Sequence, residues 1–147
     1  GIDPQKQLGT TFYAQAKQRK LHVTPLETFA EQVKMFASFS DTLMAKWLIL
    51  RAQQMLAEPS HIAADKRAWR SGDVDYLSKS QAREFNGHPK LYQLLVTARN
   101  QRWMHVLQDR LDTNGKPVFV IVGLGHLIGK DNLLDLLRAR GYTVTQL

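Results

Sequence analysis

One stretch of the sequence decides the predicted fold: Val118-Phe119-Val120-Ile121-Val122, followed by Gly123-Leu124-Gly125-His126. An uninterrupted β-branched and aromatic run, apolar on both faces, is typical of an interior strand of a parallel sheet. A helix is predicted over about 131–139, with Gly141 at its C-cap, and a closing strand over 142–147. Strand, glycine-rich turn, helix and strand together predict a βαβ unit over about 117–147.

The chain before this unit has a mainly helical pattern. Thr28 and Glu31 have the spacing of a capping box, and Leu21–Leu26 is predicted to be a short extended piece limited by Pro25. Helices are predicted over 6–20, 28–39, 43–57 (stopped by Pro59), 61–70, 74–85 and 90–111, and Asn114-Gly115 is predicted to form a turn. The helix 43–57 is apolar nearly all round, which favours a buried or interface position.

These elements predict a helix-rich α/β fold with a small mixed or parallel sheet and the C-terminal βαβ unit. We expect one unit over 1–147, with a helical insert at about 40–86. About three strand candidates are few for such a domain, because sheets usually have five or more strands. A strand that is apolar on both faces also needs neighbours. The sequence therefore predicts half of a larger α/β domain.

Composition excludes several classes of protein. The 147 residues include no Cys, which removes disulfide scaffolds, thiolate zinc sites and a cysteine nucleophile. No apolar run approaches the roughly 18 residues that a transmembrane helix needs, and the N-terminal residues do not have the pattern of a signal peptide. The net charge of +7 favours anionic partners. The basic clusters are not interleaved with aromatic residues, so nucleic-acid binding is not expected.

The glycine-rich turn after residue 122 is the first candidate site. Ligands of α/β proteins gather at the carboxyl ends of the strands, and Gly123 and Gly125 allow close approach of a ligand to the backbone there. His126 can ligate a metal or act as a general acid or base, although a histidine after a strand is often a capping or packing residue. The glycine spacing does not fit a dinucleotide-binding loop.

Two further candidates carry charge. On a regular helix over 90–111, Arg102 falls inside the apolar stripe and Arg99 lies at its edge. A buried salt bridge is the simpler interpretation, and a guanidinium that binds a carboxylate or stabilises negative charge is the functional one. Glu27 precedes a predicted helix cap, where most glutamates are caps or solvated.

In combination these motifs resemble the C-terminal half of the TraB/GumN family, which includes the Tiki metalloproteases. The resemblance spans essentially the whole chain, and its ordered motifs are Gly1-Ile2-Asp3, Leu26-Glu27-Thr28 with Gln32 and Phe36, Ala68-Trp69…Gly72-Asp73, Arg99-Asn100-Gln101-Arg102-Trp103, Val122-Gly123-Leu124-Gly125-His126-Leu127-Ile128-Gly129 and Gly141-Tyr142-Thr143-Val144.

The resemblance implies a role for four residues. His126 corresponds to the histidine of the family's second Gly-x-x-His motif and would bind a metal. Glu27 corresponds to a glutamate near the metal, and Arg99 and Asn100 to an Arg-Asn pair there. The family's first Gly-x-x-His lies in an N-terminal half that this sequence lacks, and Ala98 replaces an acidic residue found in many relatives. One histidine and one glutamate are too few ligands for a catalytic metal, so these residues alone are expected to be inactive.

The sequence therefore leads to two hypotheses of different class. The first is the C-terminal part of a divalent-metal-dependent hydrolase, a peptidase by resemblance, with manganese or cobalt favoured over zinc and a peptide or protein as substrate. The alternative is a non-enzymatic module that binds peptides or acidic ligands through Arg99 and Arg102. Expected partners are the missing N-terminal half or a second copy of the chain. The resemblance implies a bacterial, extracytoplasmic location, periplasmic or lipid-anchored, with any membrane contact through the absent segment.

Overall fold

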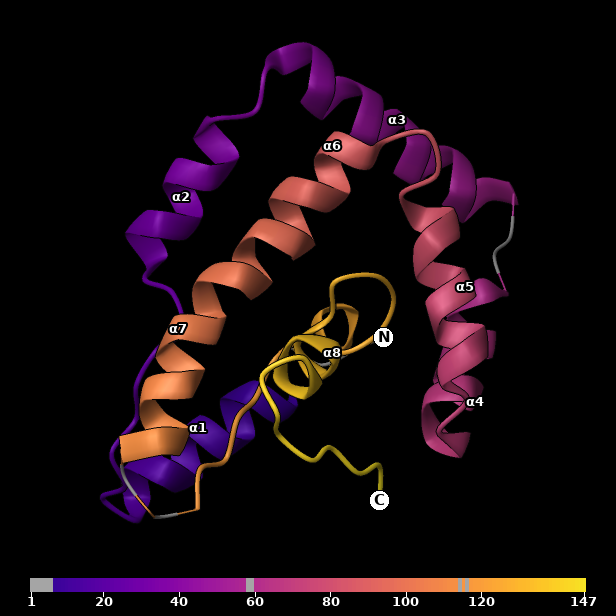
Figure 1. Cartoon of the computed structure of the whole chain (residues 1–147). Helices are drawn as coiled ribbons and strands as arrows, with labels where there is room; N and C mark the ends of the chain where they lie inside the picture. Colours follow the sequence, from indigo (N-terminus) through magenta and orange to yellow (C-terminus); the bar gives the residue numbers. More distant parts are fainter. Residues whose placement is uncertain (1–6, 58–59, 114, 116) are drawn as a thin grey trace.

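The structure, a computed structural model, describes residues 7–57, 60–113, 115 and 117–147. The described residues form helices joined by irregular segments (Figure 1). The elements α6, η2 and α7 follow one another without a break and are called the long helix. Helix α3 lies across one end of the molecule, and α8 lies between the long helix and the α4–α5 pair. The helices are α1 (Leu8–Gln18), α2 (Phe29–Ala37), α3 (Asp41–Ala57), α4 (His61–Ser71), α5 (Val74–Glu84), α6 (Pro89–Tyr92), the π-helix η2 (Gln93–Thr97), α7 (Ala98–Thr113), the 3-10 turn η3 (Leu124–His126) and α8 (Leu133–Arg138).

The predicted α/β fold is wrong. No strand occurs among the described residues, so the sheet and the βαβ unit over 117–147 are absent, although α8 occupies the position of the predicted helix. The segments 21–26, 118–122 and 142–147 have the composition of strands but irregular backbone instead. The physical reason is that a strand needs a hydrogen-bonded neighbour, and none of these segments has one in the described chain.

A local signal in the sequence predicted the start of α2 correctly. The Thr28 hydroxyl accepts a hydrogen bond from the Glu31 amide, and the Glu31 carboxylate accepts one from the Thr28 amide, which completes the capping box. Ser40 caps α3 by accepting from the Leu43 amide. Pro59, Asn114 and the Gly1-Ile2-Asp3 motif lie outside the described residues.

The π-helix η2 changes which face of the long helix is buried. A π-turn inserts one extra residue, so every later side chain is rotated by about 100° relative to a regular α-helix. The predicted stripe contained Arg102, but the buried residues after η2 are Asn100, Trp103, Met104 and Leu107. Arg102 has a half-exposed side chain. The prediction that Arg102 lies on the buried face was therefore wrong, and Arg99 is the more buried arginine of the two.

The core consists of two small clusters. In the first, Trp103, Met104 and Leu107 of α7 pack against Leu133 of α8. In the second, Ala68 of α4 and Leu77 of α5 pack against Ile128. Both clusters fix the segment 123–132 between the long helix and the α4–α5 pair, which positions His126.

Helix α3 takes little part in this core. It contains no buried residue, and the Leu56 side chain is 81% exposed. Its prediction as a buried helix is therefore wrong within this chain, and an interface role stays a prediction. A search of the described residues finds no helix with the length and hydropathy required to span a membrane.

Candidate functional site

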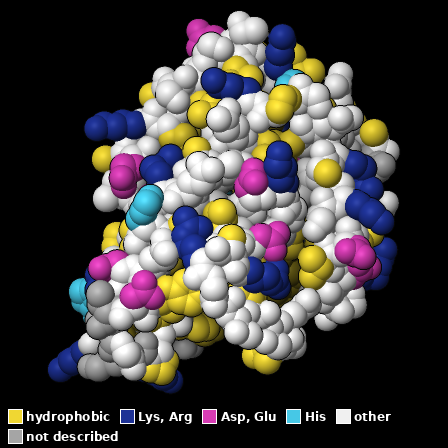
Figure 2. Space-filling model, in the orientation of Figure 1, with side chains coloured by type: hydrophobic (Ala, Val, Ile, Leu, Met, Phe, Trp, Pro, Cys, Tyr) yellow, Lys and Arg dark blue, Asp and Glu magenta, His cyan; other side chains and the backbone are white. Residues whose placement is uncertain are grey.

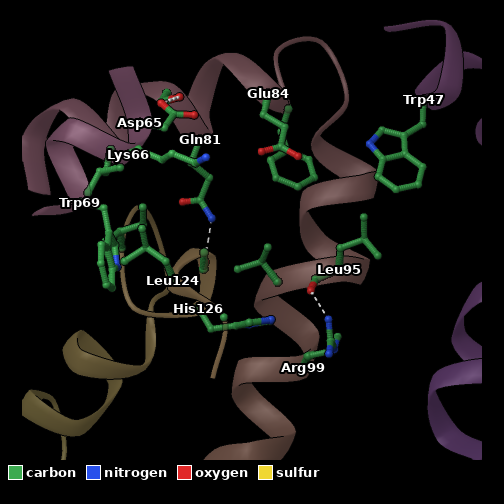
Figure 3. Close-up of a pocket in the computed structure, with 17 residues that line it drawn as sticks. Trp47, Asp65, Lys66, Trp69, Gln81, Glu84, Leu95, Arg99, Leu124 and His126 are labelled. Carbon is green, nitrogen blue, oxygen red and sulfur yellow. Dashed lines mark hydrogen bonds between the residues drawn. The ribbon is translucent and has the colours of Figure 1, made fainter. Parts of the chain in front are cut away.

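Three parts of the chain meet at the site: the turn before α2, the start of α7 and the loop after residue 122. They carry Glu27, Arg99 with Asn100, and His126, so the four residues that the resemblance pairs with a metal site lie together. Arg99 and His126 point toward each other at one end of a cleft (Figure 3).

Glu27 and Arg99 form a two-pronged ion pair. Arg99 Nε donates to one Glu27 carboxylate oxygen at 3.0 Å, and Nη2 donates to the other at 2.5 Å. Both side chains are largely buried, at 15% and 13% exposed. Gln32 Nε2 also donates to Glu27, at 3.3 Å. Both carboxylate oxygens therefore accept hydrogen bonds, and the charge of the carboxylate balances that of the guanidinium.

The π-helix contributes directly to the position of Arg99. Arg99 Nη1 donates to the main-chain oxygen of Leu95, inside η2, at 3.2 Å (Figure 3). The guanidinium carbon also lies 4.7 Å from the centre of the Trp103 ring. Carboxylate, carbonyl and indole thus hold the guanidinium in one orientation.

Asn100 fixes the ring of His126. Asn100 is fully buried, and its Nδ2 donates to the main-chain oxygen of Asp131 at 2.9 Å. Its Oδ1 lies 2.7 Å from His126 Nδ1. Because an amide oxygen only accepts, Nδ1 carries the proton and Nε2 keeps its lone pair. A histidine with this tautomer can ligate a metal or accept a proton through Nε2.

The surroundings of His126 keep the imidazole neutral. The pKa of His126 is lowered from 6.5 to about 4, chiefly by burial and also by charge repulsion from Arg99, and Glu27 offsets part of this lowering. Trp103 contacts the ring, with the two ring centres 4.4 Å apart. At neutral pH, the His126 imidazole is consequently uncharged.

The loop after His126 contains a residue, Asp131, in a left-handed backbone conformation. Asp131 adopts a φ of 54°, which is rare for a residue other than glycine. Its carboxylate accepts from the Thr97 hydroxyl at 3.3 Å, and its main-chain oxygen accepts from Asn100. Two contacts to the long helix thus hold the residue in this conformation. Strain of this kind is often found near functional sites.

Gln81 of α5 is a site residue that the sequence did not reveal. Its Nε2 donates to the main-chain oxygen of Gly125 at 2.7 Å, and only 8% of the residue is exposed. A Cβ at Gly125 would lie 2.9 Å from Nε2, and one at Gly129 would lie 2.3 Å from Oε1. The glycines at 125 and 129 therefore make room for this amide. A glutamine within a helix has no distinctive pattern, but the paired glycines were a signal of close approach.

The remaining predicted binding residues are less central. Arg102 lies on the periphery, with one contact of 4.0 Å to Glu27. The space at Gly125 is filled by Gln81, whereas a Cβ at Gly123 would meet only an ordinary contact at 3.9 Å. Their roles in ligand binding stay predictions.

A cleft of about 560 Å³ extends from Arg99 and His126 between the long helix and the α4–α5 pair. Figure 3 shows Trp69, Leu124 and His126 on one side and Trp47 and Leu95 on the other. Its walls are mostly apolar and aromatic, with the charged residues Asp65, Lys66 and Glu84 at its far end. Such a cleft beside a polar cluster is the usual form of a binding site for a small molecule or a peptide side chain.

A model of the TraB/PrgY/gumN family matches residues 1–146. The chain belongs to this family. Searches of curated proteins and of solved structures give no match. The TraB/PrgY/gumN assignment confirms the resemblance seen in the sequence over essentially its whole length. It specifies neither the reaction nor the part of the family's domain that these residues represent.

The metal implied by the resemblance fits the described residues only in part. His126 has the orientation and the protonation state of a metal ligand, and its second nitrogen is hydrogen-bonded as in many metal sites. Both oxygens of Glu27, however, accept from Arg99. In the part of the chain that the structure describes, no three His, Cys, Asp or Glu side chains are grouped to hold an ion. These residues thus offer at most one histidine and one glutamate, and a catalytic metal normally needs three protein ligands.

Proposed function

We propose that this chain carries one side of the catalytic site of a divalent-metal-dependent hydrolase that cleaves peptides. The observation that supports the proposal most directly is the hydrogen bond of Asn100 to His126 Nδ1. This contact selects the tautomer in which Nε2 binds a metal, and second-sphere contacts of this type are typical of metal-binding histidines. The low pKa of His126, about 4, favours the same role because a ligand has to be unprotonated.

Arg99 would stabilise negative charge that develops on the substrate. Its guanidinium is held rigidly by Glu27, Leu95 and Trp103, and a preorganised cation is more effective than a mobile one. Glu27 was expected to ligate the metal or act as a general base. The two hydrogen bonds from Arg99 also give Glu27 a positioning role, and a carboxylate oxygen that accepts one hydrogen bond keeps a lone pair for a metal or a proton. Asn100 would hold His126, and a bound divalent ion would supply polarisation of the peptide carbonyl and activation of water.

The other ligands would come from outside these residues. We propose that the family's first Gly-x-x-His, in the N-terminal half of its domain, completes the site, with manganese or cobalt as the ion. The chain alone would then bind metal weakly and be inactive. A location outside the cytoplasm, in a bacterial periplasm or at a lipid anchor, belongs to the same proposal and rests on the resemblance.

The proposal is tested in the complete gene product with His126→Ala and a matched control, His105→Ala. His105 is an exposed histidine of the same helix that carries Asn100. Calorimetric titration with Mn²⁺ and Co²⁺ and an assay on a peptide mixture should show loss of metal binding and turnover for His126→Ala only. Unchanged metal-dependent turnover in His126→Ala would refute the proposal.

The alternative is a peptide-binding module without turnover. The observation in its favour is the apolar cleft beside His126, which needs no metal to bind a bulky side chain. The Glu27–Arg99 pair bears on both proposals alike, because Glu27 balances the charge of the guanidinium that either role would use. Peptide binding that is unaffected by a chelator, with no turnover in the complete gene product, would favour this alternative.

A further inference from the structure

Trp69 is a large aromatic side chain that the fold holds at the surface. Helix α4 buries Ala68 in the core, and Trp69, the next residue, lies about 100° further round the helix and lines the cleft beside His126. Its side chain is well placed by the helix but 55% exposed. An indole that is held in position and left uncovered is typical of a binding surface, where Trp is enriched among the residues that contribute most to affinity.

The cleft has apolar walls on both sides. Trp69 and Leu124 lie on one side, and Trp47 and Leu95 lie on the other (Figure 3). Its volume of about 560 Å³ lies within the range of about 300–1,000 Å³ that is usual for ligand sites. A small side chain such as that of alanine would leave most of this space unfilled. An aromatic ring buries more apolar area and also gains stacking or edge contacts with the indoles.

The charged residues at the far end of the cleft do not favour a charged ligand. Asp65 accepts a hydrogen bond from the Ser80 hydroxyl at 2.9 Å, and Glu84 pairs with Arg51 at 3.2 Å. Lys66 and Arg51 together balance the charges of these two acidic side chains. Acidic and basic side chains also lie next to each other on the right of the molecule, where α4 and α5 are located (Figure 2). A neutral side chain therefore fits this cleft better than a charged one.

Two polar atoms of the cleft residues indicate that the ligand is polar in part. Trp47 Nε1, a donor, and Gln81 Oε1, an acceptor, are buried and have no hydrogen-bond partner in the described chain. The Gln81 residue is only 8% exposed, and its oxygen points toward the Trp69 side of the cleft (Figure 3). Buried polar atoms without partners cost free energy. A peptide unit carries both an N–H and a C=O and can pair with both kinds of atom, whereas a plain hydrocarbon pairs with neither.

The π-helix connects the cleft to Arg99. The Leu95 side chain lines the cleft, and the Leu95 main-chain oxygen accepts a hydrogen bond from Arg99 Nη1 at 3.2 Å. A side chain bound in the cleft therefore packs against the same residue that orients the guanidinium. Binding energy from such a remote group can be used to orient the reacting group, so a substrate without the ring should lose turnover rate as well as affinity.

We propose that the cleft between the long helix and the α4–α5 pair is the specificity subsite of the hydrolase, and that it binds an aromatic side chain next to the cleaved peptide bond. Trp69 is its specificity-determining residue. The occupant is the substrate, because a protein segment in this place would cover Arg99 and His126, which the reaction needs. The inference rests on the proposed function for turnover and on the cleft alone for binding.

The first test measures binding without turnover. The probe is N-acetyl-para-fluorophenylalanine amide, a neutral aromatic residue with a peptide unit on both sides. Its fluorine NMR signal is followed as the complete gene product is added in the presence of a chelator. We expect saturable binding that an excess of N-acetyl-phenylalanine amide displaces and an equal excess of N-acetyl-alanine amide does not. Absence of saturable binding, or equal displacement by both compounds, would overturn the proposal.

The second test measures turnover of peptide pairs that differ only by phenylalanine or alanine beside the cleaved bond. We expect kcat/KM to be about 10–100-fold higher for the phenylalanine peptide. Trp69→Ala should remove most of this difference, and Trp69→Phe should keep it. Phe29→Ala is the matched control, because Phe29 is an 80% exposed aromatic residue that does not line the cleft. Absence of the preference, or a preference that Trp69→Ala leaves intact, would overturn the proposal.

The two tests separate the subsite from the proposed function. Metal-dependent turnover without an aromatic preference would overturn the subsite and leave the function intact. Displaceable binding of the aromatic probe without any turnover would refute the function and support the cleft as an aromatic-binding site. The probe experiment uses the unaltered protein, so its result does not depend on the folding of a variant, and circular dichroism checks the fold of Trp69→Ala.

Discussion

His126 Nδ1 lies 2.7 Å from Asn100 Oδ1, and the amide nitrogen of Asn100 is bonded to the main chain of Asp131. One buried side chain of the long helix thus orients the imidazole and fixes the loop that carries it. The site depends on this contact because, among the described residues of the long helix, Asn100 is the one that is hydrogen-bonded to the imidazole.

Asn100→Ala should destabilise the fold and weaken metal binding. The substitution leaves the Asp131 oxygen and the His126 Nδ1–H without their partner, which costs about 2–3 kcal/mol of unfolding free energy. Metal affinity in the complete gene product should fall about 10–100-fold. Urea unfolding and calorimetry check these values. Gln101→Ala, an exposed neighbour, is the matched control, and equal behaviour of the two variants would contradict the prediction.

Glu27→Gln should destabilise the chain because it leaves the largely buried Arg99 charge without a counter-charge. We expect a loss of about 2–3 kcal/mol, somewhat below that of a fully buried pair. Arg138→Ala breaks an exposed pair with Asp135 and should change stability by less than about 0.5 kcal/mol. Replacement of both Glu27 and Arg99 by Leu should cost less than the sum of the single replacements. A double-mutant cycle by urea unfolding measures this coupling, and additive effects would show that the pair contributes nothing.

Protonation of His126 should destabilise the folded state in acid. Its pKa is about 4 when folded, and the unfolded value is near 6.5. Between these pH values the unfolded chain binds more protons, so stability falls as the pH falls from 6.5 to 4 and is fully kept above 6.5. Unfolding curves at several pH values measure this slope. The slope should be smaller in His126→Ala, and an identical slope would assign it to other groups.

Gly125→Ala and Gly129→Ala should both disturb the His126 loop. A Cβ at either position meets the Gln81 amide, and Gly129 also has a φ of +72°, which disfavours any side chain. We expect losses of about 1–3 kcal/mol, with the larger loss at Gly129. Gly123→Ala meets no close contact and should be nearly neutral. Thermal unfolding compares the three variants. Adding Gln81→Ala should restore part of the loss at Gly125, and no recovery would show that the amide is not the obstacle.

The sequence predicted those features that depend on near neighbours. The Thr28–Glu31 capping box was correct because it involves residues within one turn. The C-cap predicted at Gly141 was wrong: α8 ends at Arg138 with Ala139 as its C-cap, and Gly141 follows with a φ of 88°. The predicted strand at 118–122 was wrong, because strand formation depends on a hydrogen-bonded neighbouring strand that can lie at any distance along the sequence. The same dependence explains why the predicted sheet was wrong, whereas the helix predicted at the position of α8 was correct.

The candidate site was predictable only through the resemblance. The contact between Asn100 and His126 joins residues 26 positions apart, and periodicity alone gives no information about such pairs. Periodicity also placed Arg102 on the buried face of the helix. This prediction assumed a regular α-helix, because the residue types of Gln93–Thr97 do not indicate a π-helix. Gln81 could not be predicted for a related reason. Its hydrogen-bond partner is a main-chain oxygen, and a main-chain atom leaves no pattern in the residue types.

The π-helix at Gln93–Thr97 makes the site sensitive to a change of a single codon. Deletion of one residue there would return the helix to regular α geometry and rotate everything after it by about 100°. Arg99 and Asn100 would then turn away from Glu27 and His126 together, with every side chain of the site still encoded in the gene. Relatives of this chain that differ in length at this turn should therefore differ in activity even where all four residues are retained.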